Sequence, residues 1–214
     1  MKRQIENLAL LYPIPIVLVG TWVEGRANFA TVGDCAIMGL KPALVAVSLG
    51  AGCHTVRGLG EGDAFTINIP STVLLAEVDA CGIASGAHVD KSAWFSVSPG
   101  PRTGAPCIEE CPVNLECRVV ERVSFAHRRI FVAEVLVAHV EASLLEDDAV
   151  PRIAAMHAFD PIIYGLDNQY YRIGQPIGTG YAEGRDLVET EGAAPSSPPL
   201  DGGSEGATKG GSVS

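Results

Sequence analysis

The stretch RIFVAEVLVAHV, residues 129–140, decides the fold because it is a long β-type run that is apolar on both faces. Side chains of an extended strand alternate between the two faces of a sheet. The apolar residues are Phe131, Ala133, Val135 and Val137 on one face and Ile130, Val132, Leu136 and Val140 on the other. Such a strand needs cover on both sides. We therefore expect it to form a barrel wall that lies under a helix or against a partner subunit.

The segment before it, residues 113–123, has the alternation of a half-buried strand. Its two faces carry Leu115, Cys117 and Val119 on one side and Asn114, Glu116 and Arg118 on the other. Further strands are expected over residues 14–20, 43–49 and 65–69, and the last strand over 129–141. Most of these runs are long and rich in β-branched residues, which favour strands.

Helical signals are few. The run VLLAEVDAC, residues 73–81, has an apolar stripe, with Ser71 or Thr72 as a possible N-cap and Gly82 as a stop signal. A second short helix is expected from His88 through KSAWF. Strands do not alternate with long helices, which disfavours a doubly wound parallel sheet. The sequence therefore predicts a mainly β protein with short helices.

Composition limits the class of protein. The chain has 214 residues, a net charge of −10 and a hydrophobic content of 47%, which suit a packed domain without the basic field that nucleic-acid binding needs. The apolar run Ile14–Gly20 is too short to span a bilayer, and no signal-peptide cleavage pattern follows, so we expect a cytoplasmic protein that does not enter membranes. The six cysteines form no CxxC pair and are expected to be small buried apolar residues. We expect no metal site.

The composition changes at the C-terminal end. From about Tyr181 onward the chain is dominated by Gly, Ser, Pro and acidic residues, with little to bury. We expect a folded domain over residues 1–182 and a disordered tail over residues 183–214.

The glycine-rich stretch VSLGAGCHTVRGL, residues 47–59, is a candidate site. A dinucleotide fingerprint would need a third glycine where Thr55 stands. Cys53 and His54 are neighbours whose side chains diverge in an extended segment, which disfavours a metal site or a Cys/His nucleophile. Two interpretations stay open: a phosphate site that uses the glycines, Thr55 and Arg57, and an ordinary capped turn.

Two other residues present a similar choice. Lys91, beside Asp90 in a glycine-containing loop, is either half of a solvated charge pair or a site residue. His127, beside Arg128 at a strand end, is either an exposed turn residue or a donor to a cofactor.

Eight segments occur in the order found in flavin reductase-like proteins with an FMN-binding split barrel. They are YPIPIVLVGTW, NFATVGDC, KPALVAVSL, CHTVRGL, FTINIPS, CGIASGAHVDKSAWF, CPVNLECRVV and QYYRIG, across roughly residues 10–175. The chain resembles this family, and its flavoredoxin branch most closely. The resemblance implies a six-stranded antiparallel split β-barrel that forms a homodimer, with FMN near the subunit interface.

The resemblance also implies a set of residues around FMN. Asn28 and Thr31 would lie along the isoalloxazine ring or ribityl chain, near Ser48 and Leu49. Thr55, with His54 and Arg57, would hold the phosphate. Lys91, His127 and Tyr164 would close the pocket, and Lys91 and His127 would stabilise the reduced ring. Asp34 departs from the family pattern, since an aromatic residue is common there.

The implied activity is that of an FMN-dependent oxidoreductase. Its donor would be NADH or NADPH, and its acceptor a flavin, a metal or a redox protein. A flavoredoxin-type electron carrier without rapid NAD(P)H turnover is the alternative, and a flavin-sequestering protein is a third possibility.

Overall fold

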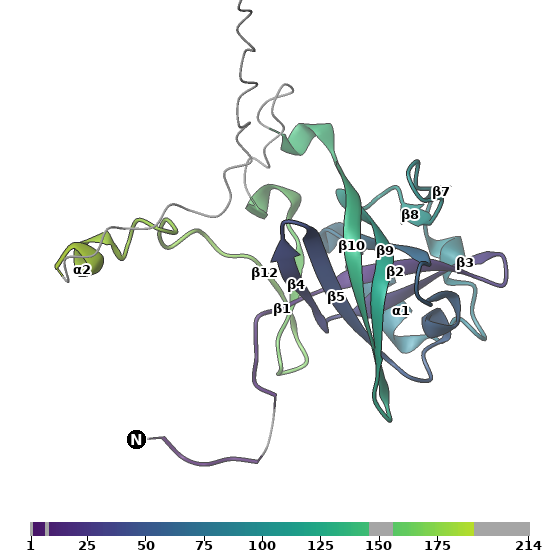
Figure 1. Ribbon diagram of the computed structural model, residues 1–214, viewed down its shortest axis with the longest axis horizontal. Coiled ribbons are helices and arrows are strands. Elements are labelled where there is room, and N and C mark those ends of the chain that lie inside the picture. The colour runs from purple at the N-terminus through teal and green to yellow at the C-terminus, as the bar shows by residue number, and fades with distance from the viewer. Residues whose placement is uncertain (1, 7–8, 146–155, 191–214) are drawn as a thin grey trace, which may run out of the picture. The chain divides into compact units, whose positions relative to one another are not determined.

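A seven-stranded antiparallel sheet forms the body of the protein in this computed structural model, which describes residues 2–6, 9–145 and 156–190 (Figure 1). The strand order is β3-β2-β6-β9-β10-β5-β4. The strands are β2 (Val17–Val23), β3 (Arg26–Val32), β4 (Cys35–Leu40), β5 (Ala43–Gly50), β6 (Ala64–Ile69), β9 (Val113–Ser124) and β10 (Arg128–Val140). β3 also approaches β5, so the sheet curls into a split barrel.

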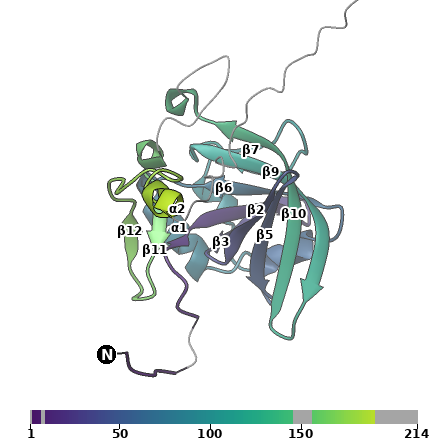
Figure 2. The ribbon, with the colours of Figure 1, turned by 60° about the vertical axis from the view of Figure 1, so that its left-hand side comes forward.

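The chain also contains smaller elements. A three-stranded sheet contains β1 (Ile14–Pro15), β11 (Ile162–Tyr164) and β12 (Tyr170–Arg172), and a separate hairpin pairs β7 (Val97–Pro99) with β8 (Pro106–Ile108). Figure 2 shows the β11–β12 hairpin where the N-terminal segment meets the barrel. The α-helices are α1 (Leu75–Ile83) and α2 (Arg185–Thr190). Among the described residues, five 3-10 turns span His54–Gly58, Thr72–Leu74, Lys91–Trp94, Ala142–Leu144 and Met156–Phe159.

The mainly β, split-barrel class predicted from the sequence is confirmed, but the main sheet has seven strands where six were expected. The strands over 113–123 and 129–141 are β9 and β10, and the expected strand over 14–20 is divided into β1 and β2. β3 and β4 were not predicted. In β3 the polar Asn28 and Thr31 interrupt the apolar pattern that marks a strand. β4 is the apolar run CAIMGL, but it is short and largely exposed, and it lacks the alternation of a half-buried strand.

The apolar core lies on both sides of the strands. The barrel interior contains Val19, Val47, Phe65, Cys117 and Phe131, all fully buried. A second cluster joins Leu18, Phe29 and Ile108 to Val78 of α1. Neighbouring residues Leu18 and Val19 therefore face different clusters, and α1 covers the outer face of β2 and β3.

The two-sided strand β10 is buried on its inner face, where Phe131 and Ala133 have no exposed surface. On its outer face, Ile130 and Val132 are half-buried. β10 packs between β9 and β5, whereas α1 packs against β3. A helix or a partner subunit was expected to cover β10, and α1 does not provide this cover.

The two predicted helical segments are found with shifted ends. The 3-10 turn Thr72–Leu74 leads into α1, which continues through Gly82 to Ile83. Gly82 lies against Thr31 of β3 and does not end the helix. The second segment is the 3-10 turn Lys91–Trp94, capped by Asp90, whose carboxylate accepts from the N–H of Ser92 at 3.1 Å.

The cysteine prediction is confirmed for Cys81, Cys107, Cys111 and Cys117, which are buried, while Cys35 and Cys53 are partly exposed. Burial raises the pKa of the Cys81 and Cys107 thiols to about 11. No helix in the described ranges is long and apolar enough to cross a membrane.

The chain divides into two compact units, Met1–Ile173 and Gly174–Ser214. The domain boundary expected at residue 182 stays a prediction. Within the expected tail, α2 is a helix of 6 residues. Residues 191–214 lie outside the described residues, and their disorder stays a prediction.

Candidate functional site

Asn28 and Thr55 form a buried polar contact at one end of the barrel. Asn28 is 5% exposed and shares a face of β3 with Ala30 and Val32, which belong to the barrel interior. Its Nδ2 donates to Oγ1 of Thr55 at 2.7 Å, and Thr55 is 1% exposed. The Thr55 hydroxyl therefore holds Asn28 in position, and its direct contact with a phosphate stays a prediction.

Gly86 closes over this contact. A Cβ atom at Gly86 would lie 1.8 Å from Oδ1 of Asn28 and 3.0 Å from Cδ2 of His54. Only glycine lets the loop after α1 approach Asn28 so closely. The loop thus brings together Asn28, His54 and Thr55, three of the residues predicted to surround the flavin.

Lys91 is a buried cation beside the same loop. Its side chain is 5% exposed, and Nζ donates to the backbone carbonyl of Cys81, near the end of α1, at 2.6 Å. Among the residues that the structure describes, no carboxylate lies within salt-bridge distance of Nζ. Burial lowers the pKa of the Lys91 ammonium because it removes water from the charged form. The interpretation of Lys91 as half of a solvated charge pair with Asp90 is therefore wrong.

His54 and Arg57 flank Thr55 in its 3-10 turn. Burial, followed by the nearby Arg57, lowers the pKa of the His54 imidazole. The Arg57 guanidinium donates to Glu24 at 2.5 Å, and both side chains are more than half exposed. Arg57 therefore points to the surface, where Glu24 already engages its charge.

Ser48 lies at the end of β5 and is held by Arg128, a residue that the sequence did not single out as a site residue. Arg128 donates from Nε to the Ser48 hydroxyl and from Nη2 to the Ser48 carbonyl, both at 3.0 Å. The same guanidinium pairs with Asp34. Asp34, where the family resemblance led us to expect an aromatic ring, thus anchors Arg128. The side chain of Leu49 packs in the barrel interior.

His127 lies in the exposed loop between β9 and β10. Its backbone carbonyl accepts from the N–H of Ala51 at 2.9 Å, which fixes the glycine-rich bend after β5. Its imidazole forms no hydrogen bond with the part of the chain that is described. The structure therefore places His127 beside the bend through its backbone.

Thr31 and Tyr164 line a common cavity of about 450 Å³. Thr31 Oγ1 donates to the carbonyl of Val78 in α1 at 2.5 Å, and the Tyr164 hydroxyl donates to Asn168 at 2.6 Å. Other lining residues are Ile14, Ile16, Gly33, Asp34, Asp79, Gly82, Ile83 and Tyr170. Thr31 and Tyr164 therefore form one group of predicted residues, at this cavity, and the residues around the loop after α1 form another. Helix α1 connects the two groups because its backbone carbonyls accept hydrogen bonds from both Thr31 and Lys91.

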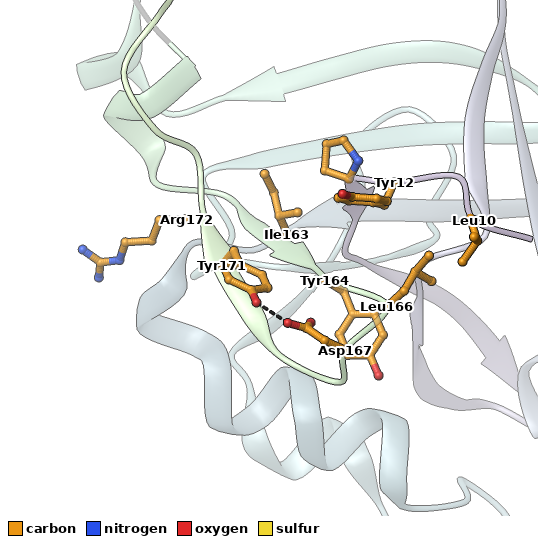
Figure 3. Close-up of a pocket in the computed structure, with 10 residues that line it drawn as sticks. Leu10, Tyr12, Ile163, Tyr164, Leu166, Asp167, Tyr171 and Arg172 are labelled. Carbon is orange, nitrogen blue, oxygen red and sulfur yellow. Dashed lines mark hydrogen bonds between the residues drawn. The ribbon is translucent and has the colours of Figure 1, made fainter. Parts of the chain in front are cut away.

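A larger cavity of about 640 Å³ lies between the N-terminal segment and the β11–β12 hairpin (Figure 3). Tyr164 is the only predicted site residue in its wall. Sequence reasoning missed Tyr12 and Tyr171 there, because nothing local shows that these two distant segments meet.

A model of the flavin reductase like domain matches residues 9–166. The flavoredoxin from Methanosarcina acetivorans is 34% identical, with a TM-score of 0.80 over 87% of this chain and 99% of its own. The flavoredoxin of Desulfovibrio vulgaris is 31% identical, with a TM-score of 0.77 over 86% of this chain and 100% of its own. An uncharacterized protein of Archaeoglobus fulgidus is 32% identical over 66% of this chain and 82% of its own. With its split barrel and these relatives, the chain belongs to the flavin reductase-like family.

Proposed function

We propose that this protein binds FMN and is an NAD(P)H-dependent oxidoreductase that passes electrons to a flavin, a metal or a redox protein. FMN, when bound, supplies the chemistry: it accepts a hydride and returns electrons. The protein must hold the cofactor, orient it and supply charge where the reduced form becomes negative. Family membership and the two flavoredoxin relatives support this assignment.

The observation that carries the proposal is the burial of Lys91 without a carboxylate partner among the described residues. A buried ammonium is costly unless it is paired, and a single carbonyl from Cys81 compensates only part of that cost. An anionic ligand beside Lys91 would complete the compensation. Reduced FMN is such a ligand because it carries negative charge on its ring and on its phosphate.

The surrounding residues fit the same ligand. The bend before Thr55 has open space beside Gly50 and Gly52, where a Cβ atom would meet nothing within 4 Å. Asn28 offers an amide next to this bend, and the cavity lined by Thr31 and Tyr164 adds a hydroxyl and an aromatic ring. We propose that these residues hold FMN, that His54 and Arg57 contribute near its phosphate, and that Ser48, Leu49 and His127 flank it.

The test begins with the full-length protein, which is titrated with FMN and followed by quenching of flavin fluorescence. Lys91→Met keeps most of the length of the side chain but removes its charge. It should weaken FMN binding by a factor of about 10 to 100, as expected for losing a hydrogen bond to a charged group. Lys2→Met is the matched control because Lys2 is exposed, and it should bind FMN as the wild type does. A folded Lys91→Met variant with unchanged affinity would refute the role of Lys91.

Anaerobic addition of NADH or NADPH to the FMN-loaded protein then tests the reaction. Loss of the oxidised-flavin absorbance within seconds supports the reductase. The alternative is a flavoredoxin-type electron carrier, favoured by the identity of 34% to a flavoredoxin over almost the whole of that chain. A carrier would keep its colour with NAD(P)H and lose it with dithionite.

We also propose that the protein is a homodimer. The outer face of β10 carries Ile130 and Val132, which lie opposite Val123 of β9 and Ala46 of β5. α1 does not cover this face because it packs against β3. A second copy would bury these apolar side chains, and a two-fold axis would place the same face on both subunits.

A further inference from the structure

We propose that the larger cavity is a second ligand site, which binds a small organic cation with an aromatic or apolar body. The cavity of about 640 Å³ lies between the N-terminal segment and the β11–β12 hairpin (Figure 3). Small-molecule sites typically enclose roughly 300 to 1,000 Å³. The proposal does not depend on FMN, because this site is lined by different residues, apart from Tyr164.

The wall of the cavity is rich in aromatic and aliphatic side chains. It contains Tyr12, Tyr164, Tyr171, Leu10, Pro13, Ile163 and Leu166. Tyr12 is 69% exposed and Tyr171 is 47% exposed, although both are large and partly apolar. Several exposed apolar side chains that converge on one cavity indicate a binding site rather than scattered surface residues.

The charge in this cavity is negative. Asp167 lies in the turn between β11 and β12 and accepts a hydrogen bond from the hydroxyl of Tyr171. This hydrogen bond raises the pKa of Tyr171, so the tyrosine stays the donor and the carboxylate stays beside the ring. Figure 3 shows Tyr164, Asp167 and Tyr171 grouped on the hairpin side of the cavity.

Arg172 also contributes to the wall, but its guanidinium points away from the cavity (Figure 3). Its Nη2 donates to the hydroxyl of Thr72 at 2.9 Å and lies 3.2 Å from Oδ2 of Asp160. The positive charge is therefore directed toward Asp160, outside the aromatic group. Of the charged side chains in the wall, Asp167 is the one that faces the rings.

Aromatic rings beside a carboxylate attract an organic cation. The face of a tyrosine ring is negative and binds ammonium or pyridinium groups, and the carboxylate adds a direct charge interaction. Apolar neighbours such as Leu10 and Leu166 favour a ligand with a hydrophobic body. A bare metal ion is not favoured, since no group of three or more His, Cys, Asp or Glu residues in the described ranges is placed to hold one.

The experiment compares three small probes that share a benzyl group and differ in charge: benzyltrimethylammonium, benzyl alcohol and phenylacetate. Each is titrated into the full-length protein by isothermal titration calorimetry. We expect benzyltrimethylammonium to bind most tightly and phenylacetate least tightly. Asp167→Asn should weaken binding of the cation about fivefold and leave benzyl alcohol unchanged. Tyr12→Ala, which removes an exposed ring, should weaken both.

Glu61→Gln is the control, because it removes an exposed carboxylate that does not line the cavity. It should bind the cation as the wild type does. Equal affinities for the cation and the alcohol, an unchanged affinity in Asp167→Asn, or no saturable binding of any probe would each overturn the proposal. These outcomes are separate from the FMN titration, which uses a different ligand and the Lys91 variant.

Discussion

Gly86→Ala gives a sharp test of the site geometry. The new methyl group would lie 1.8 Å from Oδ1 of Asn28, far inside the separation of two non-bonded atoms, and 3.0 Å from Cδ2 of His54. Asn28 must therefore move, although it is buried and bonded to Thr55 at 2.7 Å. Moving it would break this hydrogen bond between two buried side chains.

The expected loss of stability combines two effects. Leaving buried polar groups without a partner costs about 1–3 kcal/mol. Overpacking a filled region costs about 1–3 kcal/mol more. We therefore expect Gly86→Ala to lower the free energy of unfolding by about 2–6 kcal/mol, measured by urea denaturation and linear extrapolation. It should also weaken FMN binding, because Asn28 and His54 are displaced.

Gly52→Ala is the matched control, since a Cβ atom there meets nothing within 4 Å. It should leave the free energy of unfolding unchanged or raise it by up to about 1 kcal/mol through the unfolded state. The double variant Asn28→Ala/Gly86→Ala provides a second check, because removing the Asn28 side chain removes the clash. Its loss should be clearly smaller than the sum of the two single losses. A stable Gly86→Ala, or strictly additive losses, would refute the reasoning.

Two further predictions concern other parts of the barrel. Glu116 is fully buried, and although burial alone would raise its pKa, hydrogen bonds from Thr103 and His139 outweigh this and lower it. The stability that ionised Glu116 contributes is therefore complete above the pKa of the unfolded state and is lost as pH falls through the lower pKa of the folded state. Glu116→Gln should make the urea-denaturation midpoint less dependent on pH in the acid range. An unchanged pH profile would contradict this prediction. Val132→Glu should convert the proposed dimer to a monomer, as measured by light scattering. Val73→Glu is the control, at an 87% exposed site outside β10, and it should leave the dimer intact. A dimer that survives Val132→Glu would show that the outer face of β10 is not the dimer interface.

Part of this structure could be predicted from the sequence. The long runs over 113–123 and 129–140 have strand periodicity, and the ordered motifs identified the split barrel. Asn28 and Thr55 were expected in one site, and the structure joins them directly. These features depend on local patterns or on similarity to a family.

The rest depends on contacts between distant segments. Asp34 and Arg128 form an ion pair although they lie far apart in the sequence, and no local pattern indicates this pairing. The sequence around Gly86 does not distinguish it from other loop glycines, because its close approach to Asn28 appears only in the structure. Tyr12 and Tyr171 both line the larger cavity because β1 pairs with β11 and β11 pairs with β12, and no local pattern in the sequence shows these pairings.

The most direct test of the central claim is an FMN titration of the wild-type protein and its Lys91→Met variant under identical conditions. We expect saturable binding by the wild type and an affinity lower by a factor of about 10 to 100 in the variant. A wild-type protein that fails to bind FMN would rule out the proposed function. Equal affinity in a correctly folded Lys91→Met variant would show that the buried ammonium does not serve the flavin.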